Sequence, residues 1–238
     1  MRIAIMQPYF FPYLGYFQLI KSADIFILLD DVAFIKKGWI HRNRLCFNKG
    51  IHWFSVPLEH ASQNKSIHET FISQINFIQW RKKFISSLIS FYKKQEYFTD
   101  GMEIVEEIFS IPTYSIAELS ARSLQKCCKA LGITTFFNCS SSLHGLNKLK
   151  GEKKIIEICQ YYQVGRYINA PGGKELYRQS MFSPYGIQLE FIHPSLSIYP
   201  VKGRDCVLGL SIIDAIMCCG IEYTRKKLLS GYKIEEAA

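Results

Sequence analysis

The first segment of the chain constrains its fold more than any other part. A compact apolar run over residues 2–6 stops at a proline, which predicts a short buried strand. A loop rich in proline and aromatic residues follows, then a short helix over 16–22 and a second apolar strand over 24–29 that ends at Asp30 and Asp31. A strand, helix and strand in this order favour a parallel pair with a crossover helix. The chain therefore begins as an α/β protein.

The remaining segments extend this pattern after a helical interruption. Apolar residues at helical spacing predict a mainly helical insertion at about 78–131, with Gly132 in the position of a C-terminal cap. We predict a single α/β domain over 1–238, with a mostly parallel, Rossmann-like sheet flanked by helices. Further strands are expected over 53–58, 135–139, 167–170 and 187–193, and further helices over 152–162, 174–182, 210–219 and 221–229.

Composition narrows the class of protein. With 48% hydrophobic and 21% charged residues the chain can bury a core, and its net charge of +9 attracts anionic partners. The basic residues are scattered over helix faces, which is more typical of a solvated surface than of a nucleic-acid interface. The eight cysteines show no metal-ligand spacing, so we expect no metal site. Without a signal peptide or a membrane-length apolar run, we expect a soluble cytoplasmic protein.

The loop after the first strand is the first candidate binding segment. Ligands of open α/β sheets bind at the carboxyl ends of strands, and the N–H groups at the start of a helix attract anions. The candidate ligand-binding residues here are Gln7, Tyr9, Gly15 and Tyr16. The alternative is a loop of prolines and aromatic residues that only packs over the sheet.

The segment after the second strand carries charged and aromatic groups that are hard to place in a core. Arginines can hold a phosphate with two hydrogen bonds, an indole can stack on a base or sugar, and a histidine can act as a general base near neutral pH. The candidates for binding are Lys37, Trp39, Arg42 and Arg44, and those for proton transfer are His41, Asp30 and Asp31. A lone histidine is more often structural.

Two later loops lie at the ends of further predicted strands. Ser141 and His144 follow one strand, and Gly172, Gly173 and Lys174 follow the next. Hydroxyls and glycines at such positions can surround a phosphate, although serine-rich turns commonly only cap helices. The sequence contains no nucleophile elbow, Walker loop or dinucleotide fingerprint, so a hydrolase of that type, a P-loop kinase and a dinucleotide oxidoreductase are not supported.

Five stretches together resemble the WbqC-like family, which occurs among bacterial genes for O-antigen and other surface polysaccharides. They are IAIMQPYFFPYLGYFQLI, ADIFILLDDVAFIKKGWIHRNR, LGITTFFNCSS, YINAPGGKELY and LSIIDAIMCCG. Phe84, Val201 and Cys206 depart from the pattern that the family leads us to expect. The N-terminal unit is also similar to the nucleotidyltransferase (HUP-like) fold of pantothenate synthetase and class I aminoacyl-tRNA synthetases, without their histidine signature.

The resemblance implies an N-acyltransferase or aminoacyltransferase that places an acyl or glycyl group on the amine of a nucleotide-linked amino-deoxy sugar. In that reaction Asn43 or backbone N–H groups would stabilise the oxyanion, and the cationic residues would hold the diphosphate. Two alternatives stay open: an ATP-dependent adenylate-forming or nucleotidyl-transferring enzyme, and a non-catalytic module that binds a sugar nucleotide, an acyl carrier protein or an aminoacyl-tRNA. The sequence identifies no cofactor, acyl donor or oligomeric state.

Overall fold

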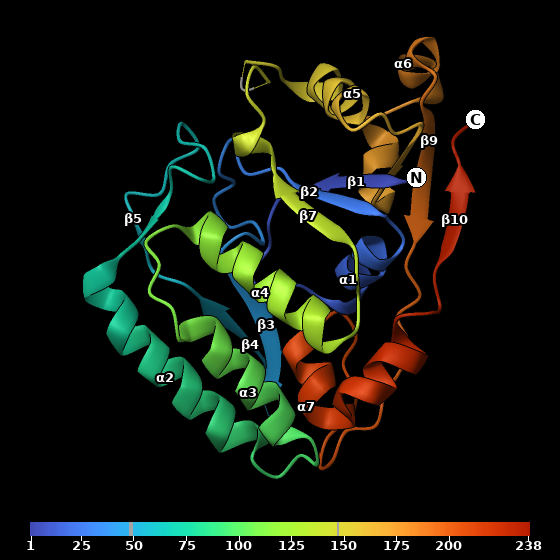
Figure 1. The fold of residues 1–238 in the computed structure, drawn as a ribbon. Coiled ribbons are helices and arrows are strands. Elements are labelled where there is room, and N and C mark those ends of the chain that lie inside the picture. Colours follow the sequence, from blue (N-terminus) through green and yellow to red (C-terminus); the bar gives the residue numbers. More distant parts are fainter. Residues whose placement is uncertain (48–49, 147) are drawn as a thin grey trace.

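The computed structural model describes residues 1–47, 50–146 and 148–238, and its central feature is a six-stranded sheet (Figure 1). The strand order is β10-β9-β8-β1-β2-β7. Strands β9, β8, β1, β2 and β7 are parallel, and β10 pairs with β9 in the antiparallel sense. Their bounds are Ile3–Met6 (β1), Ile25–Leu28 (β2), Phe136–Cys139 (β7), Arg166–Asn169 (β8), Gln188–His193 (β9) and Lys233–Glu236 (β10). The predicted Rossmann-like α/β fold is confirmed. From β1 the chain adds β2 and β7 on one side and β8 and β9 on the other, so the strand order reverses between β1 and β8.

Alternate side chains of each strand enter two separate cores, as the two-residue period of a strand requires. Ala4 and Phe26 join the core on the face that holds α1 (Leu14–Lys21) and α7 (Ile212–Tyr223). The neighbouring strand residues Ile3, Ile5, Ile25 and Ile27 point to the opposite core. That core also contains residues of α5 (Gly151–Tyr161) and α6 (Gln179–Phe182). Both faces of the sheet are therefore covered.

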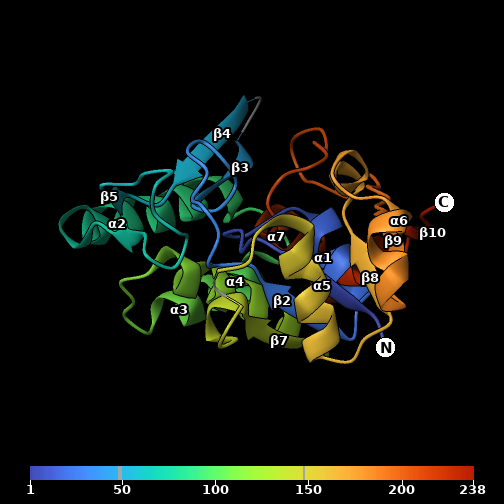
Figure 2. The same cartoon turned by 90° about the horizontal axis from the view of Figure 1, so that it is seen from above.

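A long segment between β2 and β7 forms its own group of elements. The strands β3 (Arg42–Phe47) and β4 (Gly50–Ser55) pair as an antiparallel hairpin, which projects beyond the helices in Figure 2. The strand predicted over 53–58 thus overlaps β4 but pairs outside the main sheet. The remaining elements are β5 (Leu58–Glu59), β6 (Phe71–Ile72), α2 (Gln74–Tyr92), α3 (Phe98–Phe109) and α4 (Ile116–Ala130). The division into one domain with an inserted helical part stays a prediction.

Several helix ends follow from particular residues. Gly132 has a φ of 67° just after α4, and the hydrogen bonds from Ile133 N to Cys128 O (2.9 Å) and from Gly132 N to Lys129 O (3.2 Å) complete a Schellman cap. Gly220 has a φ of 81° inside α7 and kinks the helix there, ahead of a π-helical turn over Thr224–Leu228. The kink lies between the two helices predicted over 210–219 and 221–229.

Two elements differ from the sequence-based expectation. The helix predicted over 174–182 is a 3₁₀ turn (Pro171–Glu175) followed by the short α6, because Arg178 adopts an extended backbone between them. Helix α3 lies inside the helical insertion predicted over 78–131, where no individual helix bounds were assigned, and at Gly101 the Met217 side chain occupies the space of a Cβ. Strand β10 was missed, since an exposed edge strand of mostly polar residues lacks apolar alternation. Among the helices of the described residues, none has the length and apolar character to cross a membrane.

Candidate functional site

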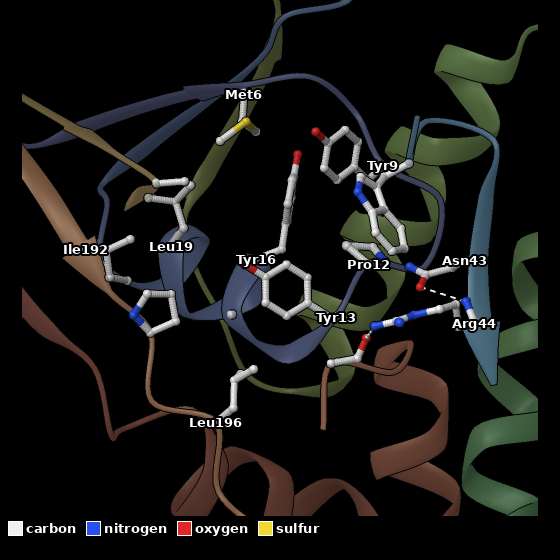
Figure 3. Close-up of a pocket in the computed structure, with 15 residues that line it drawn as sticks. Met6, Tyr9, Pro12, Tyr13, Tyr16, Leu19, Asn43, Arg44, Ile192 and Leu196 are labelled. Atoms are coloured by element: carbon white, nitrogen blue, oxygen red, sulfur yellow. Dashed lines mark hydrogen bonds between the residues drawn. The ribbon is translucent and has the colours of Figure 1, made fainter. Parts of the chain in front are cut away.

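A cavity of about 390 Å³ lies on the α1 face of the sheet, where β1, β8 and β9 end (Figure 3). The sheet reverses its strand order between β1 and β8, and open α/β sheets bind ligands at this switch point. The lining residues are Met6, Tyr9, Pro12, Tyr13, Gly15, Tyr16, Leu19, Trp39, Asn43, Arg44, Ala170, Ile192, Pro194, Leu196 and Gly209. The cavity is therefore formed by residues that are far apart in the sequence, from Met6 to Gly209.

The two N-terminal candidate segments meet beside this cavity. Phe10 N donates to Ile40 O at 3.1 Å, and Asn43 Nδ2 donates to Phe11 O at 2.7 Å. Both phenylalanine side chains are fully buried. The first loop is therefore anchored in the core by its aromatic residues while its tyrosines face the cavity. The packing interpretation of this loop therefore holds for Phe10 and Phe11, and binding by its tyrosines stays a prediction.

Arg44 supplies the positive charge of the cavity and occupies its polar end. Its Nη2 donates to Gly209 O at 3.0 Å, whereas its Nε is buried and has no hydrogen-bond partner in the described structure. The guanidinium lies 5.5 Å from the ring centre of Trp39 and 5.8 Å from that of Trp53. A buried guanidinium N–H without a partner is costly, so this end of the cavity favours a ligand with an acceptor oxygen.

Three tyrosines form much of the cavity wall. Burial raises the pKa of Tyr9, Tyr13 and Tyr16, so all three hydroxyls stay protonated at neutral pH. Tyr16 Oη donates to Gln7 O at 2.6 Å, which ties the start of the loop to α1. The phenols are thus neutral hydrogen-bonding groups and not bases.

The opposite end of the cavity is apolar. Figure 3 shows Leu19 and Ile192 across the cavity from Arg44. Among the described lining residues there is no carboxylate, thiol, imidazole or lysine. This arrangement suits a ligand with one anionic part and one weakly polar part.

Gly15 allows two walls of the cavity to approach each other. A Cβ on this residue would lie 2.5 Å from Tyr13 Cε2 and 3.0 Å from Pro194 Cβ, which is closer than side-chain carbons normally approach. The sequence analysis selected Gly15 for contact with a phosphate. In the structure its visible role is to make room for the Tyr13 ring.

The predicted acidic residues belong to a different cluster, at the ends of β2 and β7. Ser141 donates to Asp30 from its backbone N (2.9 Å) and from its hydroxyl (2.7 Å). Asp31 forms a buried salt bridge with Lys154 of α5 and also accepts from Ser140. Neither carboxylate lines the cavity. These contacts join the end of β2 to the segment after β7 and to α5, and a catalytic role for either carboxylate stays a prediction.

His41 also lies outside the cavity lining. Its ring packs on Phe34 with 5.4 Å between ring centres, and its Nδ1 is buried without a hydrogen-bond partner in the described structure. Burial and the nearby Arg42 charge lower the pKa of His41 to about 4. The imidazole is therefore neutral at pH 7 and a weaker base than an ordinary histidine.

The other predicted binding residues are placed outside the cavity. Arg42 donates to the carbonyls of Gly38 (3.0 Å) and Lys37 and lies 4.5 Å from the ring centre of Trp53. Lys174 pairs with Glu235 at 2.7 Å. Lys37, His144 and Gly172 are exposed, Gln7 is half-buried and Gly173 is buried, and none of these five residues lines the cavity. Of the sequence-based candidates, the structure brings together Tyr9, Gly15, Tyr16, Trp39, Asn43 and Arg44.

Comparison with known proteins places the chain in a family. The family model described as the WbqC-like protein family matches residues 7–226. The chain belongs to the WbqC-like family. It is also 27% identical over 224 residues to the uncharacterized protein Rv1507c of Mycobacterium tuberculosis, an alignment that covers 93% of this chain and 95% of that protein. No solved structure gives a significant match.

Sequence reasoning missed the distant walls of the cavity in this WbqC-like chain. Tyr13 lies within the candidate loop but was not selected, and Ile192, Pro194, Leu196 and Gly209 come from the segment around and after β9. These residues carry no charged or nucleophilic group. The one sequence signal for the segment around β9 was its position at the carboxyl end of a predicted strand. Its contact with the cavity that holds Arg44 depends on the fold.

Proposed function

We propose that this WbqC-like chain binds a nucleotide-linked amino-deoxy sugar in the cavity and transfers an acyl or aminoacyl group to its amine. The reaction would serve the synthesis of a bacterial surface polysaccharide. The observation that carries the proposal is the half-buried Arg44, whose guanidinium is the one charged group among the described residues that line the cavity at the switch point of the sheet. Family membership is consistent with this role.

The shape and polarity of the cavity suit such a ligand. Its volume of about 390 Å³ lies within the usual range for small-molecule sites. Arg44 would hold a phosphate oxygen through its guanidinium N–H groups, and Trp39 would pack against the base or ribose. The apolar end near Leu19 and Ile192 would receive the deoxygenated carbon of the sugar, while tyrosine hydroxyls bond its remaining oxygens.

The chemical step needs few protein groups. The neutral amine attacks the carbonyl of a thioester or ester, the new C–N bond forms, and the C–S or C–O bond of the donor breaks. The amine proton ends on the departing thiol or hydroxyl. Asn43 already uses its amide N for Phe11 O and its amide O for Arg44 N, so we assign it to holding the loop. The protonated hydroxyls of Tyr9 and Tyr13 are the donors available to a developing oxyanion.

A binding protein without turnover is the second candidate. It is favoured by one observation: no group that could accept a proton near pH 7 occurs among the described residues of the cavity wall. The predicted bases His41, Asp30 and Asp31 would have to act from outside it.

Titration calorimetry tests the binding step. We expect dTDP- or UDP-linked amino sugars to bind the wild type, and Arg44→Ala to weaken binding by at least about tenfold, as expected for loss of a charge-assisted hydrogen bond. Lys82→Ala is the matched control, because it removes the same charge from an exposed position on α2. Equal losses in both variants would indicate general charge attraction and contradict the assignment.

Mass spectrometry tests the transfer step. Incubation with a binding sugar nucleotide and an acyl-CoA, acyl carrier protein or glycyl-tRNA should yield a sugar nucleotide heavier by the acyl group. Binding without any product from all three donor classes would support the second candidate.

A further inference from the structure

The irregular segment 194–211, between β9 and α7, forms one wall of the cavity, and we call it the strap. Pro194, Leu196 and Gly209 are its contributions to the cavity lining. The strap has no regular secondary structure of its own over most of its length. Its position therefore depends on the side chains that hold it to the rest of the molecule.

Both ends of the strap are fastened close to the cavity. Gln18 of α1 donates to Ser195 O at 2.8 Å and accepts from Ser195 N at 3.1 Å. At the other end, Ser211 N donates to Arg44 O at 3.0 Å and Arg44 Nη2 donates to Gly209 O at 3.0 Å. The residue proposed to bind phosphate is thus also in contact with the strap.

The middle of the strap is fastened to one buried carboxylate. Asp214, in the first turn of α7, is fully buried and accepts from Tyr199 Oη at 2.5 Å and from Arg204 Nη2, both of the strap. It also accepts from Tyr92 Oη of α2 at 2.5 Å. A second, smaller anchor is Gln95, which exchanges two hydrogen bonds with the backbone of Lys202.

We propose that Asp214 is a positioning residue of the binding site, which fixes the strap through Tyr199 and Arg204 and so keeps the strap wall of the cavity in place. The physical reason is that a buried carboxylate is stable only with its donors in contact, so its presence selects the strap conformation that supplies them. The strap in turn places Gly209 against Arg44. The effect on a ligand rests on the proposed function, whereas the fixing of the strap does not.

The two tyrosines that bond Asp214 provide a matched pair of variants. Tyr199→Phe and Tyr92→Phe each remove one hydroxyl bonded at 2.5 Å to the same carboxylate and keep the aromatic ring. Only Tyr199 belongs to the strap. If Asp214 positions the strap, Tyr199→Phe should increase the rate of amide hydrogen exchange at Ser195, Lys202 and Ser211 by about tenfold, and Tyr92→Phe should leave it unchanged.

A binding measurement completes the test. With dTDP as the probe, we expect Tyr199→Phe to weaken binding by about fivefold to tenfold and Tyr92→Phe to leave it unchanged, although both variants lower the melting temperature. Arg204→Met keeps most of the aliphatic part of the side chain and should have the same effect as Tyr199→Phe. It replaces Tyr199→Phe in the test if Tyr199→Phe folds poorly.

The outcomes separate the two hypotheses. Equal exchange rates in the strap of Tyr199→Phe and Tyr92→Phe would overturn the positioning role and leave Asp214 with general stability alone. Suppose that amide exchange in the strap is faster in Tyr199→Phe but the wild type binds no dTDP. This result would support the positioning role and count against the proposed ligand class.

Discussion

At the residue scale, burial widens the pH range over which the groups near the cavity stay neutral. It raises the pKa of Tyr9 and Tyr16, and together with the Arg42 charge it lowers the pKa of His41 to about 4. These residues were selected from the sequence by chemical type. Their type was visible in advance, whereas their pKa depends on neighbours that only the folded chain supplies.

His41 should make the stability of the protein depend on pH. Its pKa is about 4 in the folded state and near 6.5 when unfolded, so between these values the unfolded chain binds more protons. The free energy of unfolding should therefore fall as the pH is lowered from 6.5 to 4. Urea unfolding across this range should show a smaller loss for His41→Phe than for the wild type. Identical pH profiles would mean that His41 titrates normally in the folded protein.

Gly15 should be sensitive to the addition of a single methyl group. In Gly15→Ala the new Cβ would meet the Tyr13 ring at 2.5 Å and displace it within the cavity, so binding of dTDP measured by calorimetry should weaken by about tenfold. Gly172→Ala is the control, because a Cβ there meets no atom within 4 Å. If Gly172→Ala weakened binding as much, the loop that contains Gly172 would be supported as the phosphate site in place of the cavity.

At the scale of elements, a buried ion pair outside the cavity joins α5 to the end of β2. Lys154 and Asp31 form a salt bridge in which both side chains are almost fully buried. Loss of one partner from such a pair leaves an uncompensated charge in the interior. The sequence suggested a catalytic or binding function for Asp31, and the buried lysine was not anticipated because lysine is rarely buried.

Two adjacent lysines of α5 allow this link to be tested. Lys154→Met should lower the free energy of unfolding by about 3–5 kcal/mol, since it removes the buried partner of Asp31. Lys153→Met, at an exposed position of the same helix, should change it by no more than about 0.5 kcal/mol. Chemical denaturation measures both. A loss below about 1 kcal/mol for Lys154→Met would show that the lysine charge does not stabilise Asp31 in the folded state.

At the scale of the whole molecule, one core connects the main sheet with the inserted segment. Phe10 after β1, Val105 of α3, Ile116 of α4 and Ile216 of α7 all belong to the same buried cluster. A cluster shared in this way couples the insertion to the sheet. It supports the prediction that the chain folds as one domain.

Unfolding by urea should therefore be a single cooperative transition. All three tryptophans, Trp39, Trp53 and Trp80, lie between β2 and β7, so their fluorescence reports on this part of the chain and on the groups packed against it. Far-UV circular dichroism reports on all helices and strands. The two signals should give the same midpoint. Separate midpoints would indicate that the insertion unfolds as an independent unit.

The sequence alone determined the order and type of most elements. Apolar runs such as Ile3–Met6 and Ile25–Leu28 mark buried parallel strands, and Gly132 marks a helix end, because periodicity and backbone freedom are local properties. It also placed Tyr9 and Arg44 in segments that follow strands. These predictions succeed because strand ends in parallel sheets share one edge.

Only the tertiary structure decided which candidates share a cavity. Asp31 and Arg44 both follow β2, yet Asp31 pairs with a buried lysine of α5 and Arg44 reaches a wall formed by Gly209. Asp214 had no visible partner in the sequence, since Tyr92 and Tyr199 come from distant segments. The reason is physical: a local pattern records which face of an element is apolar, but the contacts of a polar side chain depend on how distant elements pack.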